Sequence, residues 1–487
     1  MLVAATALLA LPLAAEAQQK PSRPWAEDVL YFVLIDRFAD GSNANNMDVQ
    51  RDNPGGFHGG DLVGLTRKLD DLADLGITAI WINPVALNIK GAVGAGSFMH
   101  YGHHGYWADD LSKMDPRFGT EAELKAFVDE AHRRGIKVLL DIVYNHAGYD
   151  SAYTKRPDAR DILRTTDWGT CKEEGDDITM CVGGLPDFKT EKPEVARMVV
   201  EKQIARAKAA GIDGYRLDTV KHLTPEFWAY HRKTMRENFG KDFFLLGEIF
   251  GADYLVADAY FERDDMDAAL DFSFKGETLG WLQGRGRTAA YSRFLQKRHK
   301  VRPGYIMSHY LSSHDVPMAL GELGGDVQKF RLAAALQMAS VGMPQIYYGE
   351  EVARTGNDWP SNRTDMPWGK DATLPGKGVK RDDGLRDYYK RLIAARRANP
   401  AFAHGDYTEL AKDGDLLVFQ RAMPDSGNAV LVAVNRSEKP QSATVALPAS
   451  WAGKTVTDAL TGKALGKAEA SLALTVDGLT AQYLVAN

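Results

Sequence analysis

The sequence predicts an α/β protein: a closed TIM-type (β/α)8 barrel, a small domain inserted after the third strand, and a carboxyl-terminal all-β domain. Three observations predict this fold. Apolar, strand-like runs alternate with amphipathic helices, and the alternation continues for about eight strands. The pattern then changes near Pro400 to short alternating runs typical of antiparallel strands.

Each predicted barrel strand is a nearly continuous apolar run, as expected for parallel strands covered by helices. No Gly-rich phosphate-binding fingerprint opens any helix, which favours a closed barrel over an open doubly wound sheet. The predicted strands are Val29–Ile35, Ile77–Pro84, Ile136–Val143, Ile212–Asp218, Phe243–Glu248, Ala268–Phe272, Ile306–Leu311 and Pro344–Tyr348.

Helix ends are marked by glycine before the second, third and fourth strands, at Gly76, Gly135 and Gly211. Glycine there supplies the left-handed stop of a helix. Thr120 and Glu123 form a predicted capping box at the start of one of these helices. Two helices show clear apolar faces, made by Leu62, Leu65, Leu69 and Leu72 and by Leu124, Phe127, Val128 and Ala131.

About forty residues separate the third strand from its helix, far more than an ordinary connection. We therefore assign residues 18–145 and 188–399 to the barrel and 146–187 to the inserted domain. The barrel ends with a helix that carries Leu385, Tyr389, Leu392 and Ile393. Residues 400–487 form the β domain, with runs such as Leu416–Phe419 and Ala429–Val434.

Residues 1–17 form the predicted signal peptide, because a short apolar run ends in the small-x-small pattern Ala15-Glu16-Ala17. The run is too short to span a bilayer, and we expect a secreted or periplasmic protein that has no membrane span. The basic residues that usually begin such a leader are missing, so a plain hydrophobic tail is the alternative. In an exported protein Cys171 and Cys181 could pair, with two free thiols as the other possibility.

The charge of the chain gives no reason to expect nucleic-acid binding. The formal net charge is −6, and the Lys and Arg residues are scattered. A neutral polymer suits such a surface better, and we expect a monomer.

Polar residues gather where the predicted strands end, the edge at which such barrels hold their active sites. A lone Asp at a strand end is more often a helix cap, but three carboxylates and two histidines at one rim indicate a catalytic site. The residues are Asp141, Asn145, His146, Arg216, Asp218, Lys221, His222, Glu248, His314 and Asp315.

Two carboxyl groups on neighbouring strands can lie about 5–5.5 Å apart, the separation at which one attacks an anomeric carbon and the other protonates the leaving oxygen. Arg216 is expected to hold the pKa of Asp218 down and keep it anionic. Glu248 follows an apolar run, which favours its protonated form. This division of roles predicts hydrolysis with retention.

Four segments in order resemble the motifs of the alpha-amylase family of glycoside hydrolases: Asp141–His146, Gly214–His222, Leu246–Glu248 and Leu311–Asp315. The resemblance covers the chain after the leader, with Ser313 standing where many members have Asn. It implies Asp218 as nucleophile, Glu248 as acid/base and Asp315 as the carboxylate that stabilises the transition state. It also implies sugar contacts from Tyr106, His146, Arg216 and His314, and leaving-group contacts from Lys221 and His222.

Calcium (Ca²⁺) is expected at two places. An Asn/Asp/Gly-rich stretch supplies the oxygen ligands that a hard cation needs. On composition alone, a solvated loop that binds no cation explains the stretch equally well. The stretch resembles a calcium loop of cyclodextrin glucanotransferases, with Asp40, Asn45, Asn46 and Asp61 as ligands. The family resemblance also implies a calcium between the inserted domain and the barrel, held by Asn145, Asp187 and the carbonyl of His222.

The expected activity is that of an alpha-amylase acting on α-1,4 bonds of starch-like α-glucans and maltooligosaccharides. The same fold also supports transglycosylases, exo-acting enzymes, cyclomaltodextrinases and alpha-glucosidases. An alternative without enzymatic activity is a non-catalytic transporter subunit. Gly183 stands where glucanotransferases of the family carry an aromatic, which favours hydrolysis. Phe250 resembles the transferases and favours sugar transfer.

Overall fold

The computed structural model describes residues 20–165, 175–369 and 381–487. The predicted signal peptide, residues 1–17, and Cys171 lie outside the described residues. Cys181 is described and is disulfide-bonded. Within the described ranges, no helix is both long and apolar enough to cross a membrane.

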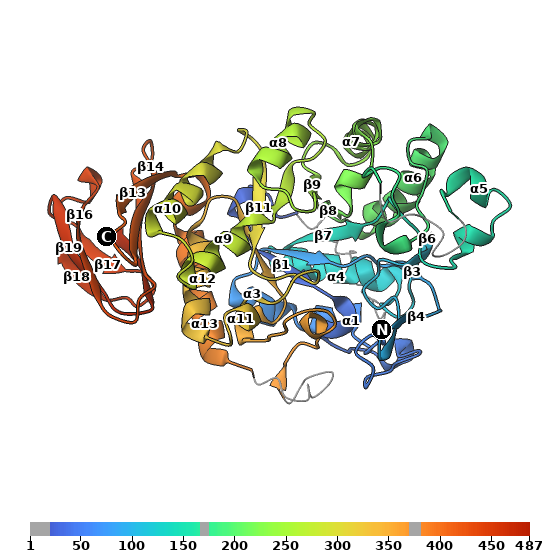
Figure 1. Cartoon of the computed structure of the whole chain (residues 1–487), viewed down its shortest axis with the longest axis horizontal. Helices are drawn as coiled ribbons and strands as arrows, with labels where there is room; N and C mark the ends of the chain where they lie inside the picture. The colour runs from blue at the N-terminus through green and yellow to red at the C-terminus, as the bar shows by residue number, and fades with distance from the viewer. Residues whose placement is uncertain (1–19, 166–174, 370–380) are drawn as a thin grey trace, which may run out of the picture.

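Eight parallel strands close into a barrel in the order β1-β12-β11-β10-β9-β8-β7-β2 (Figure 1). All eight predicted strands are confirmed. Seven are shorter than the apolar runs that predicted them, and β12 keeps the predicted length but begins one residue earlier. Their side chains are almost entirely buried because helices cover the outside and side chains fill the inside. The strands are β1 (Leu30–Val33), β2 (Ala79–Ile82), β7 (Lys137–Ile142), β8 (Gly214–Leu217), β9 (Phe244–Gly247), β10 (Ala268–Asp271), β11 (Ile306–Tyr310) and β12 (Met343–Tyr347).

The helices around the barrel begin and end largely where the sequence signals place them. The Thr120–Glu123 capping box is present, and Gly76, Gly135 and Gly211 all have positive φ. The first predicted apolar face belongs to two helices joined at Lys68. The main helices are α2 (Leu62–Arg67), α3 (Leu69–Leu75), α4 (Glu121–Arg133), α6 (Pro193–Ala210), α7 (Pro225–Phe239), α8 (Tyr254–Glu262), α9 (Ser273–Leu282), α10 (Thr288–Lys297), α12 (Val327–Ala339) and α13 (Asp383–Ala398).

Long connections follow two strands at the carboxyl end of the barrel. After β2, strands β3 (Ala86–Asn88) and β6 (Ala108–Met114) pair, and β4 (Val93–Ala95) and β5 (Phe98–His100) form a hairpin. After β7, the chain makes only short helices such as α5 (Ala159–Ile162) in the described part. His146 and Asp187 form an antiparallel bridge, so this second segment leaves and rejoins the barrel at one place.

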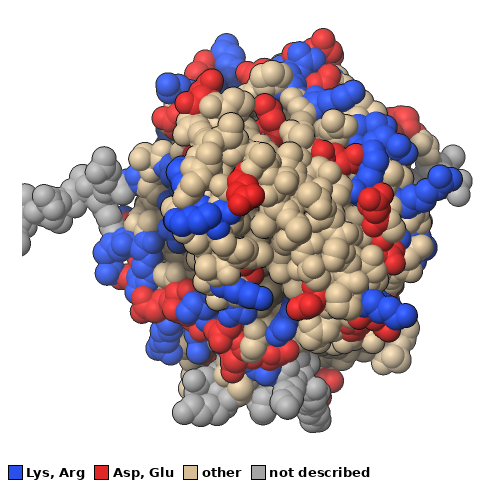
Figure 2. Space-filling view, turned by 90° about the vertical axis from the view of Figure 1, so that its left-hand side faces the viewer, with Lys and Arg blue, Asp and Glu red and all other residues tan. Residues whose placement is uncertain are grey.

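The carboxyl-terminal domain is all-antiparallel, with a six-stranded sheet, a two-stranded sheet and a hydrophobic cluster of its own. Its outward face is largely uncharged (Figure 2), because exposed positions of the smaller sheet are Ser, Thr and Ala. The strands are β13 (Asp406–Ala411), β14 (Leu416–Met423), β15 (Asn428–Asn435), β20 (Thr480–Ala486), β17 (Thr455–Asp458) and β18 (Ala464–Lys467), and β16 (Gln441–Ala446) with β19 (Ser471–Val476).

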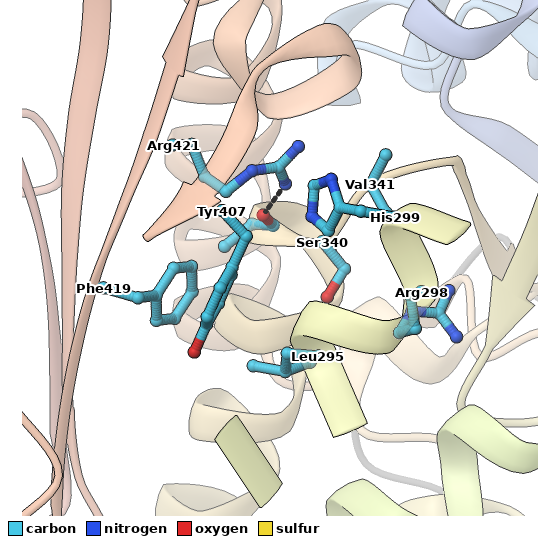
Figure 3. Close-up of a pocket in the computed structure, with 9 residues that line it drawn as sticks. Leu295, Arg298, His299, Ser340, Val341, Tyr407, Phe419 and Arg421 are labelled. Atoms are coloured by element: carbon cyan, nitrogen blue, oxygen red, sulfur yellow. Dashed lines mark hydrogen bonds between the residues drawn. The ribbon is translucent and has the colours of Figure 1, made fainter. Parts of the chain in front are cut away.

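A buried arginine joins this domain to the barrel (Figure 3). Arg421 on β14 donates to the carbonyl oxygen of Ala339, at the end of α12, at 2.7 Å and to that of Gly405 at 2.8 Å. Beside it the rings of Tyr407 and Phe419 stack. The cavity enclosed there is about 10 Å³, room for about one water molecule, so this contact is structural.

Candidate functional site

One arginine connects three carboxyl groups at the carboxyl end of the barrel. Arg216 on β8 is fully buried. Its Nη1 lies 2.6 Å from Oδ1 of Asp218 and 3.1 Å from Oδ1 of Asp141, and its Nη2 lies 2.8 Å from Oε1 of Glu248. Because β7, β8 and β9 are neighbours in the barrel, their strand ends bring together residues more than a hundred positions apart.

The pKa values of the two central carboxyl groups are both raised, to different extents. Burial raises the pKa of Asp218 to about 6, and Arg216 offsets this only in part. Arg216 lowers this pKa, as expected, but the net pKa still lies above the ordinary value of Asp, because desolvation exceeds the attraction of one shared guanidinium. Burial raises the pKa of Glu248 to about 8, which is the expected direction. The desolvated site therefore favours the protonated form of Glu248 more strongly than that of Asp218.

The third carboxylate, Asp315, follows β11 and lies in a different environment. Its Oδ2 is 3.2 Å from Nε2 of His314, and its Oδ1 accepts from Nη2 of Arg363 at 3.1 Å. Burial raises the pKa of Asp315, but His314 and Arg363 more than offset it, and the net pKa lies below the ordinary value. Asp315 therefore stays anionic.

Arg363 was missed by sequence reasoning. It ends a short 3₁₀ helix after β12, η8 (Ser361–Arg363), and belongs to no motif identified in the sequence. Its Nε also donates to the carbonyl oxygen of His314 at 2.9 Å. Trp81 was missed for a different reason, because its place in an apolar strand predicts only a core residue. Its indole nitrogen donates to Oδ2 of Asp141 at 3.0 Å, and Arg216 lies over its ring at 4.7 Å.

Tyr106 reaches the same cluster from the loop after β2. Its hydroxyl donates to Oδ2 of Asp141 at 2.6 Å, and its ring stacks on His314 with centroids 5.2 Å apart. His146 is buried, and burial lowers its pKa to about 4. Both of its ring nitrogens are buried and lack a hydrogen-bond partner among the described residues.

Lys221 and His222 follow β8 on the side of Glu248. The backbone N–H of Thr219 donates to Oε2 of Glu248 at 3.1 Å. Nζ of Lys221 lies 3.3 Å from Oδ1 of Asp177, and Nδ1 of His222 lies 2.7 Å from the Asp177 carbonyl oxygen. The structure thus ties this predicted leaving-group side to the segment that follows β7.

Two of the calcium ligands predicted between that segment and the barrel, Asn145 and Asp187, lie close to one another. Asp187 is buried, its Oδ2 accepts from Nε of Arg164 at 2.6 Å, and Phe188 donates its N–H to the carbonyl oxygen of Asn145 at 2.7 Å. Oδ1 of Asp187 and Nδ2 of Asn145 have no hydrogen-bond partner among the described residues. A buried, unpaired carboxyl oxygen fits a cation ligand.

The other predicted calcium loop already uses most of its polar atoms. Asp61 caps α2 and accepts from backbone N–H groups of the loop, and Asp40 accepts from Asn46 at 2.8 Å. The amide of Asn45 faces Asp61 at 3.2 Å. Oδ1 of Asn46 is buried without a hydrogen-bond partner in the described part of the chain. No cluster of three or more His, Cys, Asp or Glu suited to a metal is found within residues 20–165, 175–369 and 381–487, so amide and carbonyl oxygens would have to complete either site.

Gly183 and Phe250 are the two residues predicted to influence whether water or a sugar accepts the glycosyl group. Gly183 has φ +59°, and its carbonyl oxygen accepts from the hydroxyl of Tyr149 at 2.6 Å. Phe250 is 59% exposed, and its ring lies 5.2 Å from that of Phe272. The structure therefore offers an aromatic surface on the Glu248 side and no side chain at position 183.

Comparisons with known proteins identify the family to which the chain is similar. A family model for the alpha-amylase catalytic domain matches residues 32–387. A cyclomaltodextrinase of Geobacillus thermopakistaniensis is 30% identical over 90% of the chain and 74% of its own length. The periplasmic alpha-amylase of Escherichia coli is 30% identical over 82% of the chain and 71% of its own length. The structure of an Anoxybacillus alpha-amylase aligns with a TM-score of 0.82 at 29% identity, covering 96% of this chain and 99% of that one.

The family model spans most of the chain and includes every strand of the barrel after the first residues of β1. The chain therefore belongs to the alpha-amylase family of glycoside hydrolases.

Proposed function

We propose that the protein is a retaining hydrolase of α-1,4-glucosidic bonds in starch-like α-glucans and maltooligosaccharides. The observation that carries the proposal is the Arg216 guanidinium, which contacts both Asp218 and Glu248. It supports the short carboxyl separation of retaining enzymes. The different pKa values of the two carboxyl groups support one anion and one acid near neutral pH.

In the first step Glu248 donates its proton to the glycosidic oxygen while Asp218 attacks the anomeric carbon, and the C–O bond to the leaving sugar breaks. In the second step Glu248 takes a proton from water, and the water oxygen displaces Asp218. Asp315, held anionic, stabilises the oxocarbenium-like transition state. Tyr106, His146 and His314 contact the sugar at the cleavage site.

The roles are tested by replacing each carboxyl group with its amide. Asp218→Asn, Glu248→Gln and Asp315→Asn should each lower kcat on maltooligosaccharides by orders of magnitude, with an unchanged melting curve and circular dichroism. Asp358→Asn, at a carboxylate outside the cluster, is the control and should keep normal kcat. Near-normal activity of the Glu248→Gln protein would refute the assignment.

A second candidate is sugar transfer or action on cyclic substrates, favoured by exposed Phe250 and by the likeness to a cyclomaltodextrinase. The acceptor decides between hydrolysis and transfer, because either water or a sugar hydroxyl can displace Asp218. Chromatography of the products from starch, maltooligosaccharides, cyclodextrin and pullulan distinguishes these activities. New reducing ends from linear substrates support hydrolysis, whereas cyclic or lengthened products support transfer.

We also propose that Ca²⁺ stabilises the fold, that residues 1–17 direct export, and that the enzyme acts as a monomer. Asn145 and Asp187 would hold one ion together with the His222 carbonyl, and Asp40, Asn45, Asn46 and Asp61 would hold another. The unpaired oxygens of Asp187 and Asn46 support these sites. Ca²⁺ would stabilise the segment between β7 and α6 and the loop before α2, and all catalytic steps would remain with the carboxyl groups.

A further inference from the structure

The surface next to the catalytic carboxyl groups contains a groove that the proposed reaction does not use. The groove has a volume of about 480 Å³, within the usual range of about 300–1,000 Å³ for small-molecule sites. It lies along α9, the helix that follows β10. Its lining includes Phe272, Lys275, Gly276, Leu279 and Gln283.

These residues share one face of α9, since their spacing follows the three- and four-residue repeat of a helix. Gly276 is exposed near the middle of that face, and a Cβ added to it would meet nothing within 4 Å. Glycine weakens a helix relative to alanine, and no close packing requires it here. Its absent side chain leaves the groove open.

The groove joins the catalytic site on the leaving-group side. Val316, which directly follows Asp315, and Tyr310 of β11 line its end. Burial raises the pKa of Tyr310, and the Glu248 and Asp315 carboxyl groups contribute to the rise. Phe272 lies between Tyr310 and the exposed Phe250, with ring centroids 5.6 Å and 5.2 Å away.

At its other end the groove meets a second hollow, of about 500 Å³, lined by α9, α12 and the carboxyl-terminal domain. The two hollows share Gln283. The second contains Arg436, Lys439 and Gln441, and Arg436 also donates to the carbonyl oxygen of Trp281 at the end of α9. In Figure 1, α9 lies between β11 and the carboxyl-terminal domain. The two hollows, which meet at Gln283, thus form a path along α9 from Tyr310 and Val316 to the carboxyl-terminal domain.

We propose that this path, the α9 groove, binds the leaving-group portion of a long α-glucan chain and so sets a preference for polymers over short oligosaccharides. Aromatic and aliphatic side chains in its floor suit the apolar faces of sugar rings, and amide and charged groups at its rim suit their hydroxyls. The inference rests on the proposed function, because Glu248 as acid defines the leaving-group side.

The test compares a long substrate, amylose, with a short one, p-nitrophenyl α-maltotrioside, whose leaving group is too small to enter the groove. Gly276→Trp fills the groove, and Gly276→Ala is its matched control. We expect Gly276→Trp to lower kcat/KM for amylose on the order of tenfold, mainly through KM, and to leave the short substrate unchanged. Gly276→Ala should retain both activities.

A second pair of variants, with smaller changes, tests the groove if the melting curve shows that Gly276→Trp does not fold. Gln283→Ala removes the amide shared by the two hollows, and Gln296→Ala changes an exposed glutamine of α10 that lines neither. Gln283→Ala should weaken amylose cleavage selectively, and Gln296→Ala should have no effect.

The proposal is overturned if the folded groove variants keep wild-type kcat/KM for amylose, or if they lose activity equally on both substrates. If the unmodified enzyme cleaves neither substrate, the proposed function fails, and that outcome is distinct from failure of the groove.

Discussion

The pH dependence of kcat/KM tests the division of roles between Asp218 and Glu248 most directly. Asp218 must be ionised to attack, and burial raises its pKa to about 6. Glu248 must be protonated to donate, and burial raises its pKa to about 8. The profile should therefore be a bell with limbs near pH 6 and pH 8, which belong to the coupled pair.

The magnitudes follow from the fraction of enzyme in the correct protonation state. Each pH unit beyond a limb lowers that fraction about tenfold, so about a hundredfold loss is expected at pH 4, two units below the acid limb. The assay measures initial rates of reducing-end release at low maltoheptaose concentration, in buffers of constant ionic strength, after confirming that the protein stays folded at each pH.

Glu248→Gln assigns the limbs when it is assayed with an α-maltosyl fluoride. Fluoride leaves without protonation, so formation of the glycosyl-enzyme no longer needs an acid. Pre-steady-state fluoride release should then lose the limb near pH 8 and keep the limb near pH 6. Persistence of the upper limb in this variant, or a wild-type profile that is flat between pH 4 and 10, would refute the reasoning.

Three further results are expected. Removal of Ca²⁺ with a chelator should lower the melting temperature, and re-addition to a hundred times Kd should restore about 2.7 kcal/mol of stability; an unchanged melting curve, with no metal by elemental analysis, contradicts the calcium proposal. Gly183→Trp should raise the ratio of transfer products to new reducing ends several-fold relative to Gly183→Ala, which shares the positive-φ strain; equal ratios would show that this position does not select the acceptor. Burial raises the pKa of Glu350 from 4.5 to about 8, so the folded state holds this proton more tightly and stability falls as pH rises through that window, by at most about 5 kcal/mol. Urea unfolding at pH 5 to 9 should show a flatter decline for Glu350→Gln than for the wild type, and parallel curves would exclude this contribution.

The barrel was predictable because its signals are local. An apolar run, a helix face or a glycine stop is contained within a few residues. A glycine stop, as at Gly76 and Gly211, depends on backbone conformation, and a helix face depends on which side of the helix is buried. The strand-end rule then predicts, from the sequence alone, that Asp218, Glu248 and Asp315 lie at one rim.

The contacts among those residues were decided by the tertiary structure. Arg216 is shared by three carboxyl groups, and the rise in the pKa of Asp218 depends on how completely the site is desolvated, which no local spacing records. Arg363 reaches Asp315 from a short 3₁₀ helix 48 positions later, and the α9 groove combines residues from β11, α9 and the carboxyl-terminal domain.

The sequence by itself thus determined the barrel, the carboxyl-terminal β domain, the family and the set of carboxyl groups at the rim. The tertiary structure alone decided which charges share a partner, how strongly each carboxyl group is desolvated and where the surface opens beside the catalytic site. The physical reason is how far apart in the sequence the interacting residues are. Secondary structure follows from interactions between near neighbours in the chain. Electrostatics and surface shape instead depend on atoms brought together from distant segments.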